Sequence, residues 1–152
     1  MTYTPLSLHQ LRELVGHMPF NHSLGLRIAR VHRDGVTVEI PFRPDLKNLA
    51  GGLHGGVSAA LADAAVGLAI MRHFGGRRRC ATVELKINYF RPVTRGKLVA
   101  RSKLLRLGST LVVGSVELRD SEGRMTGMAL ATYMLLAGDE NLLETPLPSR
   151  EC

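Results

Sequence analysis

One carboxylate, Asp63, lies inside the most hydrophobic segment of the chain, NLAGGLHGGVSAALADAAVG, which spans residues 48–67. Burying an isolated carboxylate is costly because the charged group loses its hydration. Asp63 must therefore have a partner, become protonated, or face a cavity. From the residues alone it is either a structural acid that caps a neighbouring loop or strand, or a group that takes part in chemistry.

His54, Gly55 and Gly56 stand where a helix that contains Asp63 would begin. Helix N-termini present unpaired N–H groups and the positive end of the helix dipole. Glycine lets a ligand approach the backbone closely, so this combination can hold a developing oxyanion. The alternative also stands, in which the glycines serve turn geometry and His54 is an ordinary loop histidine.

The spacing of these residues constrains any site that uses them together. Asp63 follows His54 by nine residues. If both lie on the helix, they are about 13 Å apart along it at roughly 1.5 Å per residue, and nine steps of about 100° put them on opposite faces. They can hardly act on one carbonyl within a single chain. We therefore expect a site shared by two protomers, with Gly55 of one chain facing Asp63 of the other.

The elements that position these residues follow from hydrophobic periodicity. A short amphipathic helix is predicted over residues 8–17, opened by a capping box of Ser7 and Gln10. A second helix, apolar on every side and therefore buried, is predicted from His54 to about Arg72.

Strand patterns account for most of the remaining chain. Two strands are predicted within residues 26–42 around an Asp34–Gly35 turn, with Pro41 marking an edge or a bulge. Four more follow at residues 80–90, 97–107, 110–120 and 125–137, spaced as in an antiparallel meander. In the strand over residues 80–90, simple alternation puts Ala81, Val83, Leu85, Ile87 and Tyr89 on one face and Thr82, Glu84, Lys86 and Asn88 on the polar face.

This element order predicts an α+β fold. One antiparallel sheet of about six strands curls around one long central helix, with the short N-terminal helix beside them. A free sheet edge or face then needs a partner, so we expect at least a dimer. The chain is interpreted as one domain over residues 1–152, with the N-terminal helix within about 1–20 and a tail over about 138–152.

Composition limits the function classes. The 152 residues carry a formal charge of +7 and a pI of about 10.1, which favours an anionic partner, but three Tyr, four Phe and no Trp make stacking on nucleic acid unfavourable. Two cysteines and the lack of a signal-peptide pattern predict a cytoplasmic protein. The apolar run over residues 57–71 is too short for a membrane span.

The segment NLAGGLHGGVSAALADAA, with the later INYFRP and LRLGST, resembles the hot dog fold acyl-CoA thioesterases of the phenylacetic-acid-degradation type. The resemblance extends from about Asn21 to Leu136. It implies that Asp63 is the general base or nucleophile and that the Gly55 N–H polarises the thioester carbonyl. It further implies that His54 holds the loop and contacts the thioester region, that Asn48 assists, and that Thr82 positions water.

The same resemblance implies a coenzyme A site, with coenzyme A as part of the substrate and no separate cofactor or metal. The residues that correspond to the nucleotide-gripping strand ends and turn are Tyr89, Arg91, Pro92, Arg106, Gly108, Ser109 and Thr110. Arg95 is a further candidate for phosphate. Taken singly, each arginine is better explained as a solvated surface charge than as a phosphate contact. The resemblance also implies a site across a homodimer interface, with dimers pairing into a tetramer and no nucleic-acid or membrane partner.

The leading hypothesis is hydrolysis of an acyl-CoA thioester to the free acid and coenzyme A. One alternative is a hydratase or dehydratase of acyl chains on the same fold, whose members use a His–Asp/Glu pairing at a different spacing. Another is a non-catalytic module that binds acyl-CoA or nucleic acid, in which Asp63 would have no clear purpose.

Overall fold

The computed structural model describes residues 3–138, so the predicted tail lies outside it apart from Gly138. The helices are α1 (Leu8–Gly16), α2 (Pro19–Ser23), the 3-10 turn η1 (Pro44–Leu46) and α3 (Gly55–His73). The strands are β1 (Arg27–His32), β2 (Gly35–Pro41), β3 (Cys80–Tyr89), β4 (Lys97–Leu107), β5 (Leu111–Asp120) and β6 (Met125–Leu135).

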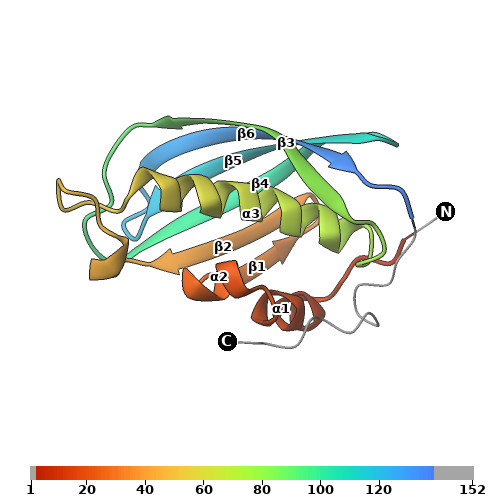
Figure 1. Ribbon diagram of the computed structural model, residues 1–152, viewed down its shortest axis with the longest axis horizontal. Coiled ribbons are helices and arrows are strands. Elements are labelled where there is room, and N and C mark those ends of the chain that lie inside the picture. Colours follow the sequence, from red (N-terminus) through yellow and green to blue (C-terminus); the bar gives the residue numbers. More distant parts are fainter. Residues whose placement is uncertain (1–2, 139–152) are drawn as a thin grey trace.

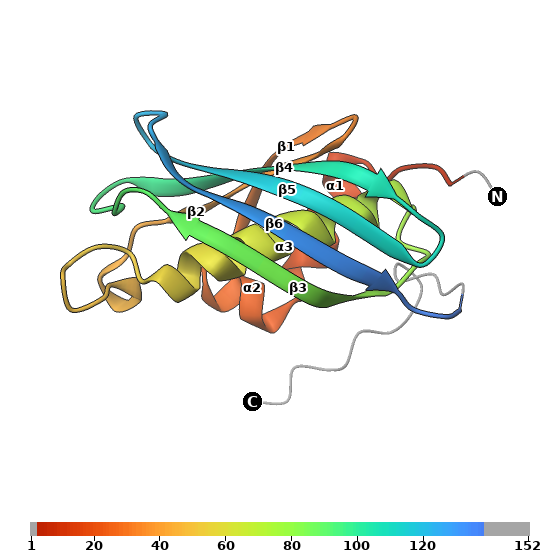
Figure 2. The ribbon, with the colours of Figure 1, turned by 90° about the horizontal axis from the view of Figure 1, so that it is seen from above.

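The six strands form one antiparallel sheet in the order β1-β2-β4-β5-β6-β3, as predicted for the α+β fold. The sheet curves over α3, and α1 and α2 lie beside α3 next to β1 and β2 (Figure 1). Seen from above, β3 is the free edge of the sheet on the side away from β1 (Figure 2). The predicted hot dog architecture, one long central helix wrapped by a six-stranded sheet, is confirmed.

The core lies between α3 and the inner face of the sheet. Fully buried side chains of α3 include Leu61, Val66 and Ile70, and they meet buried residues of the central strands. Small residues allow the close approach: a Cβ at Gly114 on β5 would lie 2.8 Å from a methyl carbon of Val66. Burying this much apolar surface is the main contribution to stability, at roughly 25 cal/mol per Å² removed from water.

The expectation that the apolar run is too short to span a membrane was wrong as a length argument. α3 has 19 residues and a mean hydropathy of 1.3 over its most apolar window, so it meets the length and composition of a span. Half of that window is buried inside the protein. The apolar surface of α3 is therefore explained by the sheet that covers it.

Three local predictions need correction. α3 begins at Gly55, because His54 has an extended backbone and is the N-cap. The sequence reading missed α2, in which Pro19 opens a new helix just after α1. Pro41 is neither on an edge strand nor at a bulge. It is the last residue of β2 and lies beyond Glu39, which forms the last pair with β1 through Arg27. Because Pro41 has no partner on β1, its missing N–H breaks no bond to that strand.

A β-bulge at Val83 overturns the simple alternation predicted for β3. Thr82 pairs with Tyr133 of β6 and Glu84 pairs with Thr132, so Val83 is the extra residue and is 58% exposed. A bulge reverses the facing of the residues on one side of it relative to the other. Thr82 is therefore on the inner face toward α3, whereas Glu84 stays on the outer face, as predicted.

Candidate active site

The start of α3 leaves one backbone donor unused. The His54 ring accepts a hydrogen bond at Nδ1 from the Gly56 N–H, 2.9 Å away, and caps the helix. The His54 carbonyl oxygen accepts from the Val57 N–H. Within residues 3–138 the Gly55 N–H has no hydrogen-bond partner, so it is free to bind an incoming oxygen at the positive end of the helix dipole.

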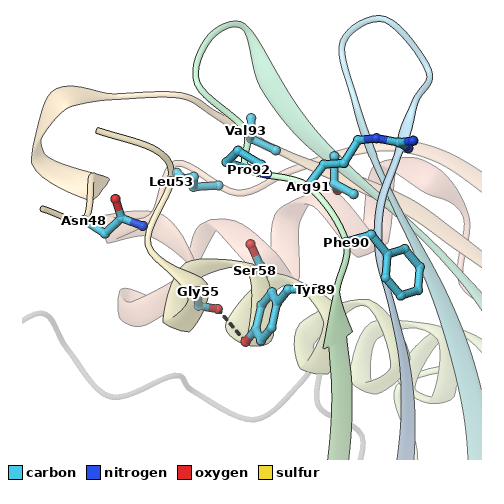
Figure 3. Close-up of a pocket in the computed structure, with 10 residues that line it drawn as sticks. Asn48, Leu53, Gly55, Ser58, Tyr89, Phe90, Arg91, Pro92 and Val93 are labelled. Atoms are coloured by element: carbon cyan, nitrogen blue, oxygen red, sulfur yellow. Dashed lines mark hydrogen bonds between the residues drawn. The ribbon is translucent and has the colours of Figure 1, made fainter. Parts of the chain in front are cut away.

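Tyr89, at the end of β3, fixes this helix start from the other side. Its hydroxyl donates to the Gly55 carbonyl oxygen over 3.0 Å. Figure 3 shows the Tyr89 ring turned toward Gly55, while the neighbouring Phe90 ring points away from it. The bond ties the Gly55 carbonyl, and with it the first turn of α3, to the sheet.

A cavity of about 330 Å³ opens beside Gly55. Its lining comes from the loop before α3, the first turn of α3, the segment after β3 and the start of β6: Asn48, Leu53, Gly55, Ser58, Tyr89, Phe90, Arg91, Pro92, Val93 and Thr126 (Figure 3). Four of the residues predicted from sequence thus line the same cavity as Gly55. Ser58 and Thr126 were not predicted, and nothing in their spacing singled them out.

Asn48 has a structural task as well as a place in the cavity wall. Its side-chain oxygen accepts from the Gly52 N–H at 3.1 Å, and its backbone N–H donates to the Gly52 carbonyl oxygen. These bonds close the loop that leads into His54. The amide nitrogen of Asn48 is the part of the side chain that this loop does not use.

Asp63 is half-buried on α3 and is held by two hydroxyl groups. The Thr82 hydroxyl lies 3.0 Å from Oδ1 and 3.2 Å from Oδ2. The Tyr133 hydroxyl lies 2.8 Å from Oδ1. Tyr133 was missed by sequence reasoning; the available signal was a tyrosine on an otherwise apolar strand face, whose hydroxyl needs a partner when buried.

Two neighbours of Asp63 have shifted pKa values. Burial, followed by the charge of Asp63, raises the pKa of the Cys80 thiol to about 11. Burial also raises the pKa of Tyr133, with the charge and hydrogen bond of Asp63 adding to it and a hydrogen bond from Thr82 opposing it. Both groups are therefore protonated at neutral pH.

Gly55 and Asp63 lie on α3 about 12 Å apart, as eight residues at roughly 1.5 Å each require. The condition for His54 and Asp63 to occupy opposite helix faces is not met, because His54 is the N-cap and α3 begins at Gly55. Measured from Gly55, eight steps of about 100° leave an angle of about 80°. β3 contacts both residues, Gly55 through Tyr89 and Asp63 through Thr82, so both border the free edge of the sheet.

The structure separates the predicted coenzyme A residues into two groups. Tyr89, Arg91 and Pro92 line the Gly55 cavity. Arg106 and residues 108–110 lie at the other end of the sheet, where the Thr110 carbonyl oxygen accepts from Leu135, the β6 partner of Cys80. Arg95 pairs with Glu122 at 2.5 Å on an exposed surface, so it already has an anionic partner.

Within residues 3–138 there is no group of three or more His, Cys, Asp or Glu side chains arranged to hold a metal ion. The groups that the structure brings to this site are the Asp63 carboxylate, the Thr82 and Tyr133 hydroxyls and the helix N-terminus.

Comparison with known proteins identifies thioesterases as relatives of this chain. The sequence model described as Thioesterase superfamily matches residues 50–126. The medium/long-chain acyl-CoA thioesterase YigI of Escherichia coli strain K12 is 33% identical, over 86% of this chain and 97% of that protein. The crystal structure of thioesterase HI1161 from Haemophilus influenzae has a TM-score of 0.81 at 26% identity, covering 96% of this chain and 99% of the other.

A thioesterase family protein from Silicibacter pomeroyi is similar to the same extent, with a TM-score of 0.79 at 26% identity over 86% of this chain and 98% of that one. The matched residues include the end of the loop before α3, the whole of α3 and the strands β3, β4 and β5. The chain therefore belongs to the Thioesterase superfamily, has its hot dog fold, and is a thioester hydrolase.

Proposed function

We propose that this enzyme hydrolyses acyl-CoA thioesters to the free acid and coenzyme A. The observation that carries the proposal is the unpaired N–H of Gly55, a residue that lines a cavity built by four segments of the described chain. The name of the relative YigI supports an acyl-CoA substrate. The net charge of +7 suits the phosphates of coenzyme A, and no cofactor beyond the substrate is needed.

In the proposed reaction the Gly55 N–H binds the thioester carbonyl oxygen and stabilises the negative charge that develops on it. Asp63 either takes a proton from water as the water oxygen bonds to the carbonyl carbon, or attacks that carbon itself. The carbon–sulfur bond then breaks, and the leaving sulfur of coenzyme A takes up a proton, from Asp63 in the first case and from water in the second. In the second case water then cleaves the acyl–Asp63 anhydride, which releases the free acid and restores the carboxylate. His54 supports the step by holding the loop and helix start in place.

The site requires two copies of the chain. Asp63 and Gly55 of one chain are too far apart to meet one carbonyl, yet both border β3, whose outer edge has no partner strand within residues 3–138. Val83, Tyr89 and Phe90 expose apolar surface along it, each more than half exposed. Antiparallel pairing with β3 of a second copy brings the Thr82 end of one strand to the Tyr89 end of the other, and with it Asp63 to Gly55 of the partner subunit.

The same pairing reunites the predicted coenzyme A residues. Arg106 and residues 108–110 lie at the Cys80 end of the sheet, so in an antiparallel dimer they approach Arg91 and Pro92 of the other chain. The two arginines then supply positive charge from both subunits to one coenzyme A. The pairing of dimers into a tetramer and the cytoplasmic location stay predictions.

Two substitutions at one position test the function. Gly55→Pro removes the N–H, and proline suits the first position of a helix after an extended residue such as His54. Gly55→Ala keeps the N–H, and its Cβ would meet the Tyr89 ring at an ordinary 3.4 Å. Thiol release from aromatic, short-, medium- and long-chain acyl-CoAs should fall about 10²- to 10³-fold in the proline variant and little in the alanine variant.

Two outcomes argue against the proposal. If the wild-type enzyme releases thiol from no acyl-CoA in the panel, acyl-CoA is not its substrate class. If Gly55→Pro stays folded and as active as Gly55→Ala, the Gly55 N–H does not bind the carbonyl oxygen.

A further inference from the structure

Tyr133 reaches from the sheet to the catalytic carboxylate. It lies on the inner face of β6, pairs in register with Thr82 of β3, and is 5% exposed. Its hydroxyl oxygen is 2.8 Å from Asp63 Oδ1 and 2.7 Å from the Asp63 carbonyl oxygen. One side chain therefore contacts both the carboxylate and the backbone of the same residue.

Gly67 provides the space for this hydroxyl. It lies four residues after Asp63 on α3, so the two residues share a helix face. A Cβ at Gly67 would be 3.1 Å from the Tyr133 hydroxyl oxygen, and the nearest ring carbons would be at an ordinary 3.5 Å. The backbone of Gly67 does not have a positive φ. A glycine within a helix is less favourable than alanine, so the hydroxyl explains its presence better than the backbone does.

The chemistry of the group fixes its role. Burial and the nearby Asp63 charge raise the pKa of Tyr133, so the phenol keeps its proton at neutral pH and can donate it. Thr82 donates to the same carboxylate from the neighbouring strand. Two donors attached to two different strands leave the carboxylate little freedom to rotate.

We propose that Tyr133 is a positioning residue, whose hydroxyl, seated over Gly67, acts with Thr82 to hold the Asp63 carboxylate in the orientation from which it attacks the thioester or activates water. The inference rests on the proposed function, because it assigns Asp63 the reacting role. Tyr133 does not need to touch the substrate for this.

Tyr133→Phe removes the hydroxyl and keeps the ring. We expect kcat for acyl-CoA hydrolysis to fall roughly 10- to 100-fold, the range for losing a hydrogen bond to a charged group, with KM unchanged. Tyr3→Phe is the matched control, since Tyr3 packs edge-on against Phe74, just beyond the end of α3, and its loss of a hydroxyl should leave both constants unchanged.

Gly67→Ser should lower kcat in the wild type but raise it in the Tyr133→Phe variant. In the wild type, Gly67→Ser and Gly67→Ala both put a Cβ against the Tyr133 hydroxyl, so each should lower kcat severalfold. In Tyr133→Phe the space is vacant, and a serine hydroxyl at position 67 can reach the carboxylate one turn away. Tyr133→Phe/Gly67→Ser should regain most of the lost kcat, whereas Tyr133→Phe/Gly67→Ala should not.

Wild-type kcat in Tyr133→Phe, or equal kcat in the serine and alanine double variants, would overturn the proposal. If Tyr133→Phe fails to fold, Gly67→Ala alone decides, because a folded Gly67→Ala enzyme with unchanged kcat also overturns it. Crystal structures of the variants separate this inference from the proposed function. Even if no acyl-CoA is hydrolysed, Asp63 should leave Thr82 or adopt several rotamers in Tyr133→Phe, and a carboxylate that does not move would contradict the positioning role.

Discussion

The Tyr89 hydroxyl donates to the Gly55 carbonyl oxygen over 3.0 Å and so joins the end of β3 to the first residue of α3. Seven residues earlier on the same strand, Thr82 donates to Asp63. β3 thus contacts both Gly55, which is proposed to bind the carbonyl oxygen, and Asp63, the proposed base or nucleophile. It is also the free edge of the sheet.

Asp63→Asn should leave the protein folded and reduce acyl-CoA hydrolysis at least 100-fold, because the amide can neither accept the proton from water nor attack a thioester. The amide oxygen can still accept from Thr82 and Tyr133, so the melting temperature should change little. Asp45→Asn, at an exposed carboxylate, is the control. An Asp63→Asn enzyme with more than a tenth of wild-type kcat would remove Asp63 from the reaction.

Mixed dimers test whether the site is shared. Asp63→Asn chains and Gly55→Pro chains should each be inactive alone. A heterodimer purified through two different tags has one site with both residues intact, and should recover about half of the wild-type turnover per dimer. Tagged wild-type dimers give the reference, and a verified heterodimer without activity would place the whole site in one chain.

His54→Ala should destabilise the start of α3, because the Gly56 N–H loses its side-chain acceptor. The expected loss is about 1 kcal/mol in the free energy of unfolding, as for other N-cap side chains. Denaturant unfolding measures it, with His54→Asn as the variant that retains an acceptor and His9→Ala as the exposed control. Equal unfolding free energies for His54→Ala and the wild type would show that the cap is not stabilising.

Cys80 should report the charge on Asp63. With a pKa of about 11, the thiolate fraction of Cys80 is about 0.1% at pH 8, so alkylation in a Cys152→Ser background should be slow and accelerate as the pH rises. The Asp63 charge is one cause of the raised pKa, so Asp63→Asn should lower that pKa and speed alkylation. Mass spectrometry gives the rates, and equal rates in the two proteins would mean that Asp63 is not charged beside the thiol.

Arg106→Gln should raise KM for acyl-CoA about three- to tenfold and leave kcat unchanged, if the β4–β5 turn binds a coenzyme A phosphate. The same variant should not affect a pantetheine thioester, which lacks the nucleotide. Arg30→Gln on β1 is a matched exposed arginine far from this turn. An unchanged KM for acyl-CoA would exclude Arg106 from the coenzyme A site.

Much of this protein could be predicted from its sequence, because local patterns determine local structure. The apolar helix with one carboxylate, the glycine-rich helix start and the alternating strands specify the α+β fold and place Gly55 at a helix N-terminus. The capping box at Ser7 and Gln10 is local as well, and the structure contains it. The turn predicted at Asp34–Gly35 lies one residue earlier, at Arg33 and Asp34, because Gly35 begins β2 and pairs with His32.

Only the tertiary structure decided which side chains meet. Thr82 belongs to the polar face by alternation, and the bulge at Val83 alone turns it toward Asp63. Tyr133 is 70 residues from Asp63 in the sequence, and its contact depends on the order of the strands and on the absence of a side chain at Gly67. Hydrogen bonds between distant segments depend on register and on space between packed layers, which no short stretch of sequence contains.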